Sequence, residues 1–124
     1  FNLNVTPMGL HGKITSGDFS ECMKSLAQCM SDLKKGDSIA IIVKECRQSF
    51  LEMVNDELEN LNDGNNMEIT FEGVEEGKIS YLDVTMAKGM EFRYVLVDPD
   101  GMTENEKYIA YTRAMEKLFV LDEP

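Results

Sequence analysis

Ile39-Ala40-Ile41-Ile42-Val43 is an unbroken apolar run, most of it β-branched, and it is the clearest indication of fold class in this chain. A strand with one face in water alternates apolar and polar side chains, whereas a strand covered on both faces reads as a continuous apolar run. Tyr94-Val95-Leu96-Val97 has the same character. Both stretches therefore predict central strands of a parallel sheet with helices on both faces.

Helical patterns flank the first of these strands. Asp18, with Glu21 three residues later, matches a capping box, and apolar residues then recur at helical spacing as far as Leu33. Gly36 follows two lysines and is expected to end that helix. A second helix is predicted over residues 46–61 because apolar side chains fall on one face up to an Asp-Gly-Asn-Asn stop.

The rest of the chain continues the alternation. Strands are predicted over residues 67–71 and 79–85, and Thr103 with Glu106 forms a second capping box that opens a helix through Glu116. Residues 118–121 then supply a closing strand. Strands and helices in alternation predict one α/β domain over residues 1–124, and residues 1–17 are expected to be an irregular leading segment with a short strand near Lys13 and Ile14.

Composition sets the class of protein. The 124 residues suit one compact domain, and no apolar run approaches the ~20 residues of a membrane-spanning helix, so no membrane role is expected. The chain begins at Phe1 without the features of a signal peptide, which we interpret as a piece of a longer protein. A formal net charge of −11 argues against a broad phosphate-binding surface, so the domain alone should bind DNA weakly.

The three cysteines predict neither a disulfide nor a metal centre. Cys22 and Cys29 lie two helical turns apart, which is too far for a disulfide bond. With Cys46 they show no CxxC spacing, and His11 is the one imidazole in the chain, so we expect no metal site. Free thiols fit a reducing compartment, and a cytoplasmic location is expected.

Two short motifs near the C-terminal end carry the chemistry. The first is Lys88-Gly89-Met90-Glu91-Phe92, between two predicted strands, where open α/β sheets place ligand-binding loops at the carboxyl ends of strands. The second is Tyr108-Ile109-Ala110-Tyr111-Thr112-Arg113-Ala114, which is predicted to be helical. The structural alternatives are a plain glycine turn for the first motif and, for Arg113, a salt bridge with Glu106 or Glu116.

In this order the two motifs resemble the last two motifs of the UvrD/Rep-type superfamily 1 helicases, whose usual forms read KGLEF and YVALTRA. Residues 39–58, with Lys44 at the end of the strand, are more loosely similar to the segment after the family's fourth motif. The resemblance implies a RecA-like three-layer domain with a mainly parallel sheet. It further implies the C-terminal motor half of an ATP-dependent DNA helicase or translocase, which pairs with an N-terminal RecA-like domain and acts on single-stranded DNA.

The resemblance also implies roles for individual residues. Arg113 reaches the γ-phosphate of ATP bound by the other domain, Glu91 contacts the ribose, and Gly89 lets the loop come close to the nucleotide. Thr85 lies closest to DNA, and Lys88 either supports the loop or contacts the phosphates or the DNA backbone. An arginine suits phosphate because it stays charged and offers paired planar donors.

The sequence departs from the family at several places. Thr85 stands where the family often has His, and Arg93 where it often has Asp. No GxxxxGK[ST] phosphate loop or acidic DExx strand is present, so ATP and Mg²⁺ would be held mainly by the N-terminal domain and the 124 residues alone are expected to be inactive.

The short interval before Lys88 leaves no room for the inserted domain of many UvrD/Rep-type members. This makes the chain similar to the compact HelD-type helicases that act with RNA polymerase, which is the alternative interpretation. A degenerate, non-enzymatic interaction domain is the other.

Overall fold

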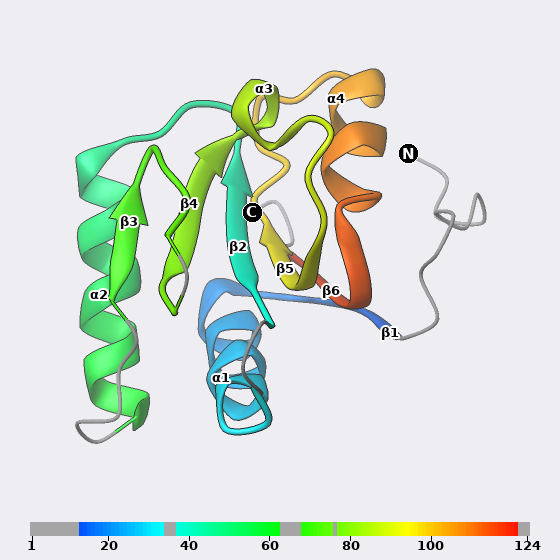
Figure 1. Cartoon of the computed structure of the whole chain (residues 1–124). Coiled ribbons are helices and arrows are strands. Elements are labelled where there is room, and N and C mark those ends of the chain that lie inside the picture. The colour runs from blue at the N-terminus through cyan, green and yellow to red at the C-terminus, as the bar shows by residue number, and fades with distance from the viewer. Residues whose placement is uncertain (1–12, 34–36, 63–67, 76, 122–124) are drawn as a thin grey trace.

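The computed structural model describes residues 13–33, 37–62, 68–75 and 77–121, and it confirms the α/β prediction. Six strands form one sheet in the order β1-β6-β5-β2-β4-β3, and every neighbouring pair is parallel (Figure 1). The strands are β1 Lys13–Gly17, β2 Ile39–Val43, β3 Ile69–Phe71, β4 Ile79–Asp83, β5 Phe92–Val97 and β6 Ala114–Leu121, and the helices are α1 Phe19–Met30, α2 Gln48–Asn62, α3 Val84–Ala87 and α4 Glu104–Tyr111.

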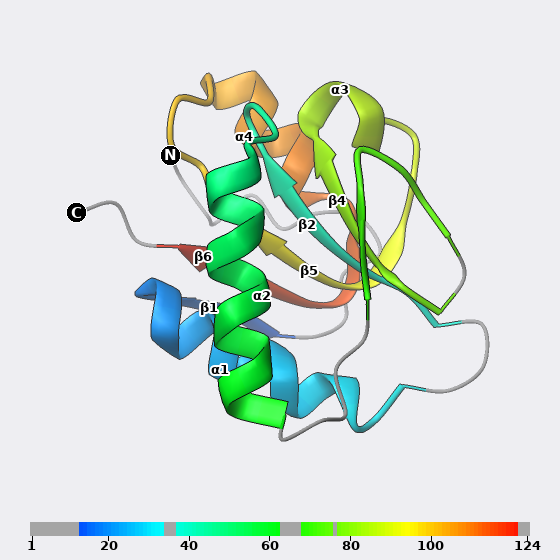
Figure 2. The ribbon, with the colours of Figure 1, turned by 90° about the vertical axis from the view of Figure 1, so that its left-hand side faces the viewer.

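Helices cover both faces of the sheet, and β2 shows why its sequence is apolar throughout. Ile39 and Ile41 pack in a core with α1 and α2, whereas Ala40 and Ile42 pack in a second core with α3 and α4. All four side chains are 0% exposed. Figure 2 looks onto α2, which crosses in front of the strands. Continuous burial on both faces is the property that the apolar run predicted.

Residues 13–17, the described part of the leading segment, are more regular than expected. Residues 13–17 form β1, which pairs with β6 over its whole length, from Lys13 beside Lys117 to Gly17 beside Leu121. The short strand predicted near Lys13 and Ile14 is therefore confirmed and longer than expected, because a parallel partner far away in sequence supplies its hydrogen bonds. The remainder of the leading segment lies outside the described residues.

The first two helices keep their predicted positions but not all their ends. The capping box of Asp18 and Glu21 is present at the start of α1. The helix ends at Met30, not at Gly36, because the Ser31 N–H and hydroxyl turn back onto carbonyls of the last turn. Gly36 itself lies outside the described residues. α2 matches its prediction within two residues at either end.

Arg93 joins three segments at the amino-terminal edge of the sheet. Its guanidinium pairs with Asp37 before β2 and with Glu116 on β6, and it donates to the Asp32 carbonyl after α1. It also lies over the Tyr94 ring, 4.8 Å from the ring centre. These contacts raise the pKa of Arg93, with the hydrogen bond to Asp37 as the largest cause. The unusual arginine at this position therefore has a structural role in the domain.

Candidate functional site

The first motif forms a short connection between α3 and β5. Asp83 ends β4 and caps α3 through a hydrogen bond from the Met86 N–H, and Lys88 is the C-cap of that helix. Gly89 follows with φ of 84°, a left-handed conformation that favours glycine, and Phe92 begins β5. The strand predicted to run to Thr85 thus ends at Asp83, and Thr85 lies on α3.

This connection corrects the expected position of the motif. The loop starts near the carboxyl end of β4 but finishes at the amino end of β5, because β2, β4 and β5 are parallel and β5 must be entered from the opposite edge. Glu91 therefore precedes a strand and does not follow one. Gly89 has open space where a Cβ would be, so glycine is needed there for its backbone conformation. The expected close approach of this loop to a nucleotide stays a prediction.

Arg113 is not on a helix, contrary to prediction. α4 begins with the predicted capping box of Thr103 and Glu106 but ends at Tyr111, and β6 begins at Ala114. Thr112, the C-cap, turns its hydroxyl back onto the Ile109 carbonyl at 3.0 Å. Residues 114–116 belong to the strand because Ala114 pairs with Phe92 on β5, and from Lys117 onward β6 pairs with both β5 and β1.

The guanidinium of Arg113 joins the two motifs. Its Nη1 donates to the Met90 carbonyl at 3.0 Å, its Nε to the Ile109 carbonyl at 3.1 Å, and its Nη2 to the Thr112 hydroxyl at 3.1 Å. The backbone adds a further link, since the Phe92 N–H donates to the Arg113 carbonyl at 2.9 Å. The structure thus brings Arg113 into direct contact with the Lys88–Phe92 loop, in the turn that leads into β6.

No carboxylate pairs with Arg113 among the described residues. Of the two acids considered for a salt bridge, Glu106 pairs with Lys44 and Glu116 with Arg93. All three acceptors of the Arg113 guanidinium are uncharged oxygens. The salt-bridge alternative is therefore excluded for the described part of the chain, where this half-buried cation contacts uncharged oxygens alone.

Glu91 lies beside Arg113 at the strand starts, whereas Gly89 lies in the turn at the end of α3 that the Met90 N–H closes on the Ala87 carbonyl, and Thr85 lies on α3 itself. Glu91 is exposed. Phe92 on β5 pairs with Ala114 on β6, and Glu91 and Arg113 are the residues directly before these two partners. Thr85 and Lys88 are also exposed, but they belong to the α3 end of the connection, next to the carboxyl end of β4. The structure therefore divides the sequence-predicted residues between two edges of the sheet.

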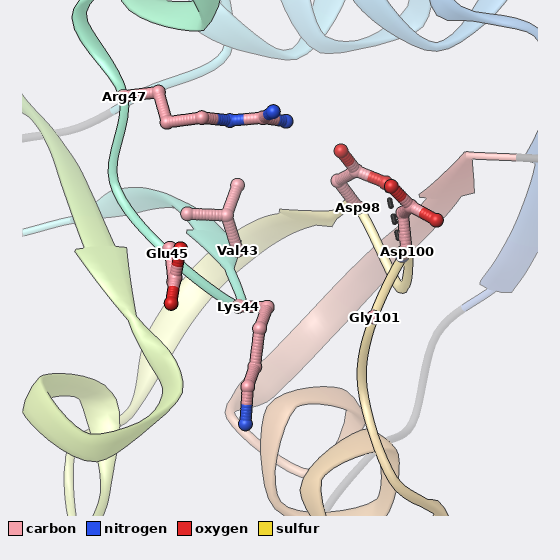
Figure 3. A pocket seen from close by; sticks show the side chains of 7 residues that line it. All are labelled: Val43, Lys44, Glu45, Arg47, Asp98, Asp100 and Gly101. Carbon is pink, nitrogen blue, oxygen red and sulfur yellow. Dashed lines mark hydrogen bonds between the residues drawn. The ribbon is translucent and has the colours of Figure 1, made fainter.

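A pocket that the sequence motifs did not indicate lies at the edge of the sheet formed by the carboxyl ends of the strands. It measures about 180 Å³ and lies between the ends of β2 and β5, whose following helices cover opposite faces. Such a switch point is where open parallel sheets form ligand crevices. Figure 3 shows Arg47 extending toward Asp98 and Asp100 across this pocket. Its lining residues are Val43, Lys44, Glu45, Arg47, Asp98, Asp100 and Gly101.

Lys44, the pocket residue that the sequence singled out, is already paired. Its ammonium contacts the Glu106 carboxylate on α4, and this hydrogen bond is the largest cause that lowers the pKa of Glu106. The other side of the pocket is the Asp-Pro-Asp-Gly turn after β5. This turn could have been predicted from the sequence, since Asp and Gly are typical of loops that follow strands.

Two classes of feature are absent from the described residues. No group of three or more His, Cys, Asp and Glu side chains in residues 13–33, 37–62, 68–75 and 77–121 could hold a metal ion. Within the same residues no helix is long and apolar enough to cross a bilayer. His11 lies outside the described residues. The three cysteines, all of them among the described residues, form no disulfide bond, and Cys22 and Cys29 are buried.

Comparison with known proteins shows the fold. No protein-family model and no curated sequence matches the chain. The C-terminal domain of a possible DNA helicase from Lactobacillus plantarum superposes with a TM-score of 0.57 at 20% identity, over 96% of this chain and 76% of that one. The arterivirus nonstructural protein 10 helicase, in complex with DNA, gives 0.50 at 13% identity, over 88% of this chain and 28% of that one. The chain therefore has the RecA-like fold of helicase domains.

Proposed function

We propose that this chain is the C-terminal motor domain of an ATP-dependent DNA helicase or translocase of the UvrD/Rep type. In this proposal it completes the ATP site of an N-terminal RecA-like domain and contributes to movement along single-stranded DNA. The observation that carries the proposal is the bond between Arg113 and the Met90 carbonyl, which unites the two helicase-like motifs. The likeness in fold to two helicases adds support of a general kind.

The guanidinium of Arg113 suits an incoming phosphate. An arginine carries five N–H donors, and the three hydrogen bonds to Met90, Ile109 and Thr112 use one donor on each of its nitrogens. One N–H on each terminal nitrogen is left, and two such donors can bind two phosphate oxygens. Because the three acceptors are uncharged, they fix the guanidinium without neutralising the charge that a γ-phosphate would meet.

The two edges of the sheet would serve two ligands. Glu91 and Arg113 would face the nucleotide at the starts of β5 and β6, with Glu91 directed to the ribose. Thr85, and Lys88 where its role is to contact the DNA backbone, would approach DNA from the α3 side. The Thr85–Glu91 connection would then transmit movement between the two ligands, since its ends lie near opposite edges of the sheet.

The triphosphate and Mg²⁺ would be held mainly by the N-terminal domain. The sequence has no phosphate loop, and the described residues hold no cluster of acids that could bind the ion. The chemistry that Mg²⁺ would supply there is partial neutralisation of the phosphate charge. This chain would supply Arg113 and Glu91 to the other side of the nucleotide, so the 124 residues alone should show no ATP turnover above background.

The test is Arg113→Ala in the full-length protein. Arginine fingers contribute roughly 10³- to 10⁵-fold to turnover, so we expect kcat for ATP to fall by a factor in that range while ATP affinity weakens much less. Lys24→Ala is the matched control, because it removes one exposed cation from α1. Turnover that is unchanged in Arg113→Ala, or equally reduced in Lys24→Ala, would reject the proposed role.

A HelD-type ATPase that acts with RNA polymerase is the second candidate. The observation that favours it is the short interval of residues 63–87 between α2 and the Lys88–Phe92 motif, which leaves no room in the sequence for the inserted domain of many UvrD/Rep-type helicases. Co-purification of the full-length protein with RNA polymerase, together with failure to separate DNA strands, would favour this candidate. Strand separation without polymerase binding would favour the first. A domain that has lost its enzymatic partner is the third, and an intact phosphate loop upstream in the parent gene would exclude it.

A further inference from the structure

We propose that Thr112 is a positioning residue for Arg113, an inference that rests on the proposed role of Arg113 at the ATP site. The hydroxyl of Thr112 donates to the Ile109 carbonyl at 3.0 Å, so its lone pairs are free to accept the Arg113 Nη2 at 3.1 Å. A single hydroxyl therefore connects the end of α4 to the guanidinium. It fixes the direction of the side chain that would meet the phosphate.

The end of α4 makes this arrangement possible. The Arg113 N–H bonds to the Ala110 carbonyl, and the helix does not continue, so the Ile109 carbonyl has no helical partner and accepts two side-chain donors instead. These donors are the Thr112 hydroxyl and the Arg113 Nε. A cation beside the last carbonyls also complements the negative end of the helix dipole.

The three contacts act on different parts of the guanidinium. The Ile109 carbonyl holds Nε, the Met90 carbonyl holds Nη1, and the Thr112 hydroxyl holds Nη2. Removal of the hydroxyl leaves Nη2 without its acceptor, and the guanidinium then gains rotational freedom about its terminal bonds. Valine keeps the shape of threonine without the hydroxyl, whereas serine keeps the hydroxyl without the methyl group.

The first test needs only the 124-residue chain. Side-chain NMR of Arg113, with resonances assigned by comparison with Arg113→Lys, reports whether the terminal N–H groups rotate slowly. We expect slow rotation in the wild type and in Thr112→Ser, and fast rotation in Thr112→Val. Slow rotation in Thr112→Val would overturn the inference. Should that variant fail to fold, Thr112→Ala gives the same comparison without a second methyl group.

The second test is ATP turnover by the full-length protein. Loss of one hydrogen bond that orients a transition-state donor corresponds to about a tenfold fall in rate, so we expect kcat of Thr112→Val to fall about tenfold with KM changed less than about twofold. Thr112→Ser should restore kcat to within about twofold of the wild type. Equal losses in both variants, or no loss in Thr112→Val, would overturn the positioning role.

Failure of this inference is separable from failure of the proposed function. If Arg113→Ala abolishes turnover but Thr112→Val does not, Arg113 contacts the nucleotide and the hydroxyl has no part in orienting it. If Arg113→Ala leaves turnover intact, the proposed function fails, and the positioning role at the ATP site fails with it. The NMR result then describes a structural contact alone.

Discussion

The Arg113 guanidinium donates a 3.0 Å hydrogen bond to the Met90 carbonyl, although the two residues are 23 positions apart in the sequence. The contact depends on β5 and β6 starting side by side, since Phe92 pairs with Ala114. Because each motif directly precedes one of these strands, the sheet itself brings the glycine turn and the arginine together. Substitutions in either strand start should therefore affect both motifs.

Gly89→Ala should destabilise the chain by about 1–2 kcal/mol, because φ of 84° places a Cβ in the unfavourable left-handed region. No atom within 4 Å would clash with that Cβ, so the cost comes from the backbone alone. Gly89→Asn is the matched control, since asparagine adopts this conformation more readily. Urea unfolding measures the difference. An equal cost for alanine and asparagine would show that backbone conformation is not the cause.

Glu106→Gln should increase the affinity of the 124-residue chain for single-stranded DNA. The substitution releases Lys44 at the mouth of the carboxyl-edge pocket, while a glutamine still accepts the Thr103 N–H of the capping box. We expect a gain of a few-fold at low salt that disappears at high salt, as fluorescence anisotropy with a labelled oligonucleotide would measure.

Glu104→Gln provides the control for that gain. It removes the same charge from the same helix turn, and its carboxylate lies 3.8 Å from the Lys107 ammonium. An equal gain in both variants would mean that net charge alone governs DNA binding, and that release of Lys44 contributes nothing.

Cys46 should react slowly with alkylating reagents at neutral pH although its side chain is only half-buried. Burial first, and the Asp83 and Glu72 carboxylates next, raise its pKa from 9.0 to about 11. Because the pKa is raised, the thiolate is scarce below it, and at pH 8 alkylation should be about a hundredfold slower than for an unperturbed thiol. The rate should climb until about pH 11, which mass spectrometry of the Cys46 peptide can follow.

A companion variant separates the two causes of this shift. Asp83→Asn keeps a side chain able to cap α3 but removes one carboxylate, so the pKa of Cys46 should fall slightly. A plateau near pH 9 in the unmodified chain would contradict the raised pKa itself.

The sequence alone determined the class of fold and the order of its elements apart from α3, whose first residues the sequence pattern assigns to the preceding strand. The apolar run of β2 required helices on both faces, and the capping boxes at Asp18 and Thr103 marked the starts of α1 and α4 correctly. These features are local, because periodicity and caps depend on residues within a few positions of each other. The two motifs are also recognisable in the sequence, and their order alone resembles that of helicase motifs.

The tertiary structure alone decided where Arg113 lies and what it touches. Helical spacing favoured a helix as far as Glu116, but α4 ends at Tyr111, Ala114 pairs with Phe92 on β5, and the arginine lies in the turn between them. The pocket between β2 and β5 likewise has Arg47 and Asp98 in its lining, although they are about fifty positions apart in the sequence. Both features arise from strand pairing between distant segments, and no local pattern of side chains records which strands will be neighbours.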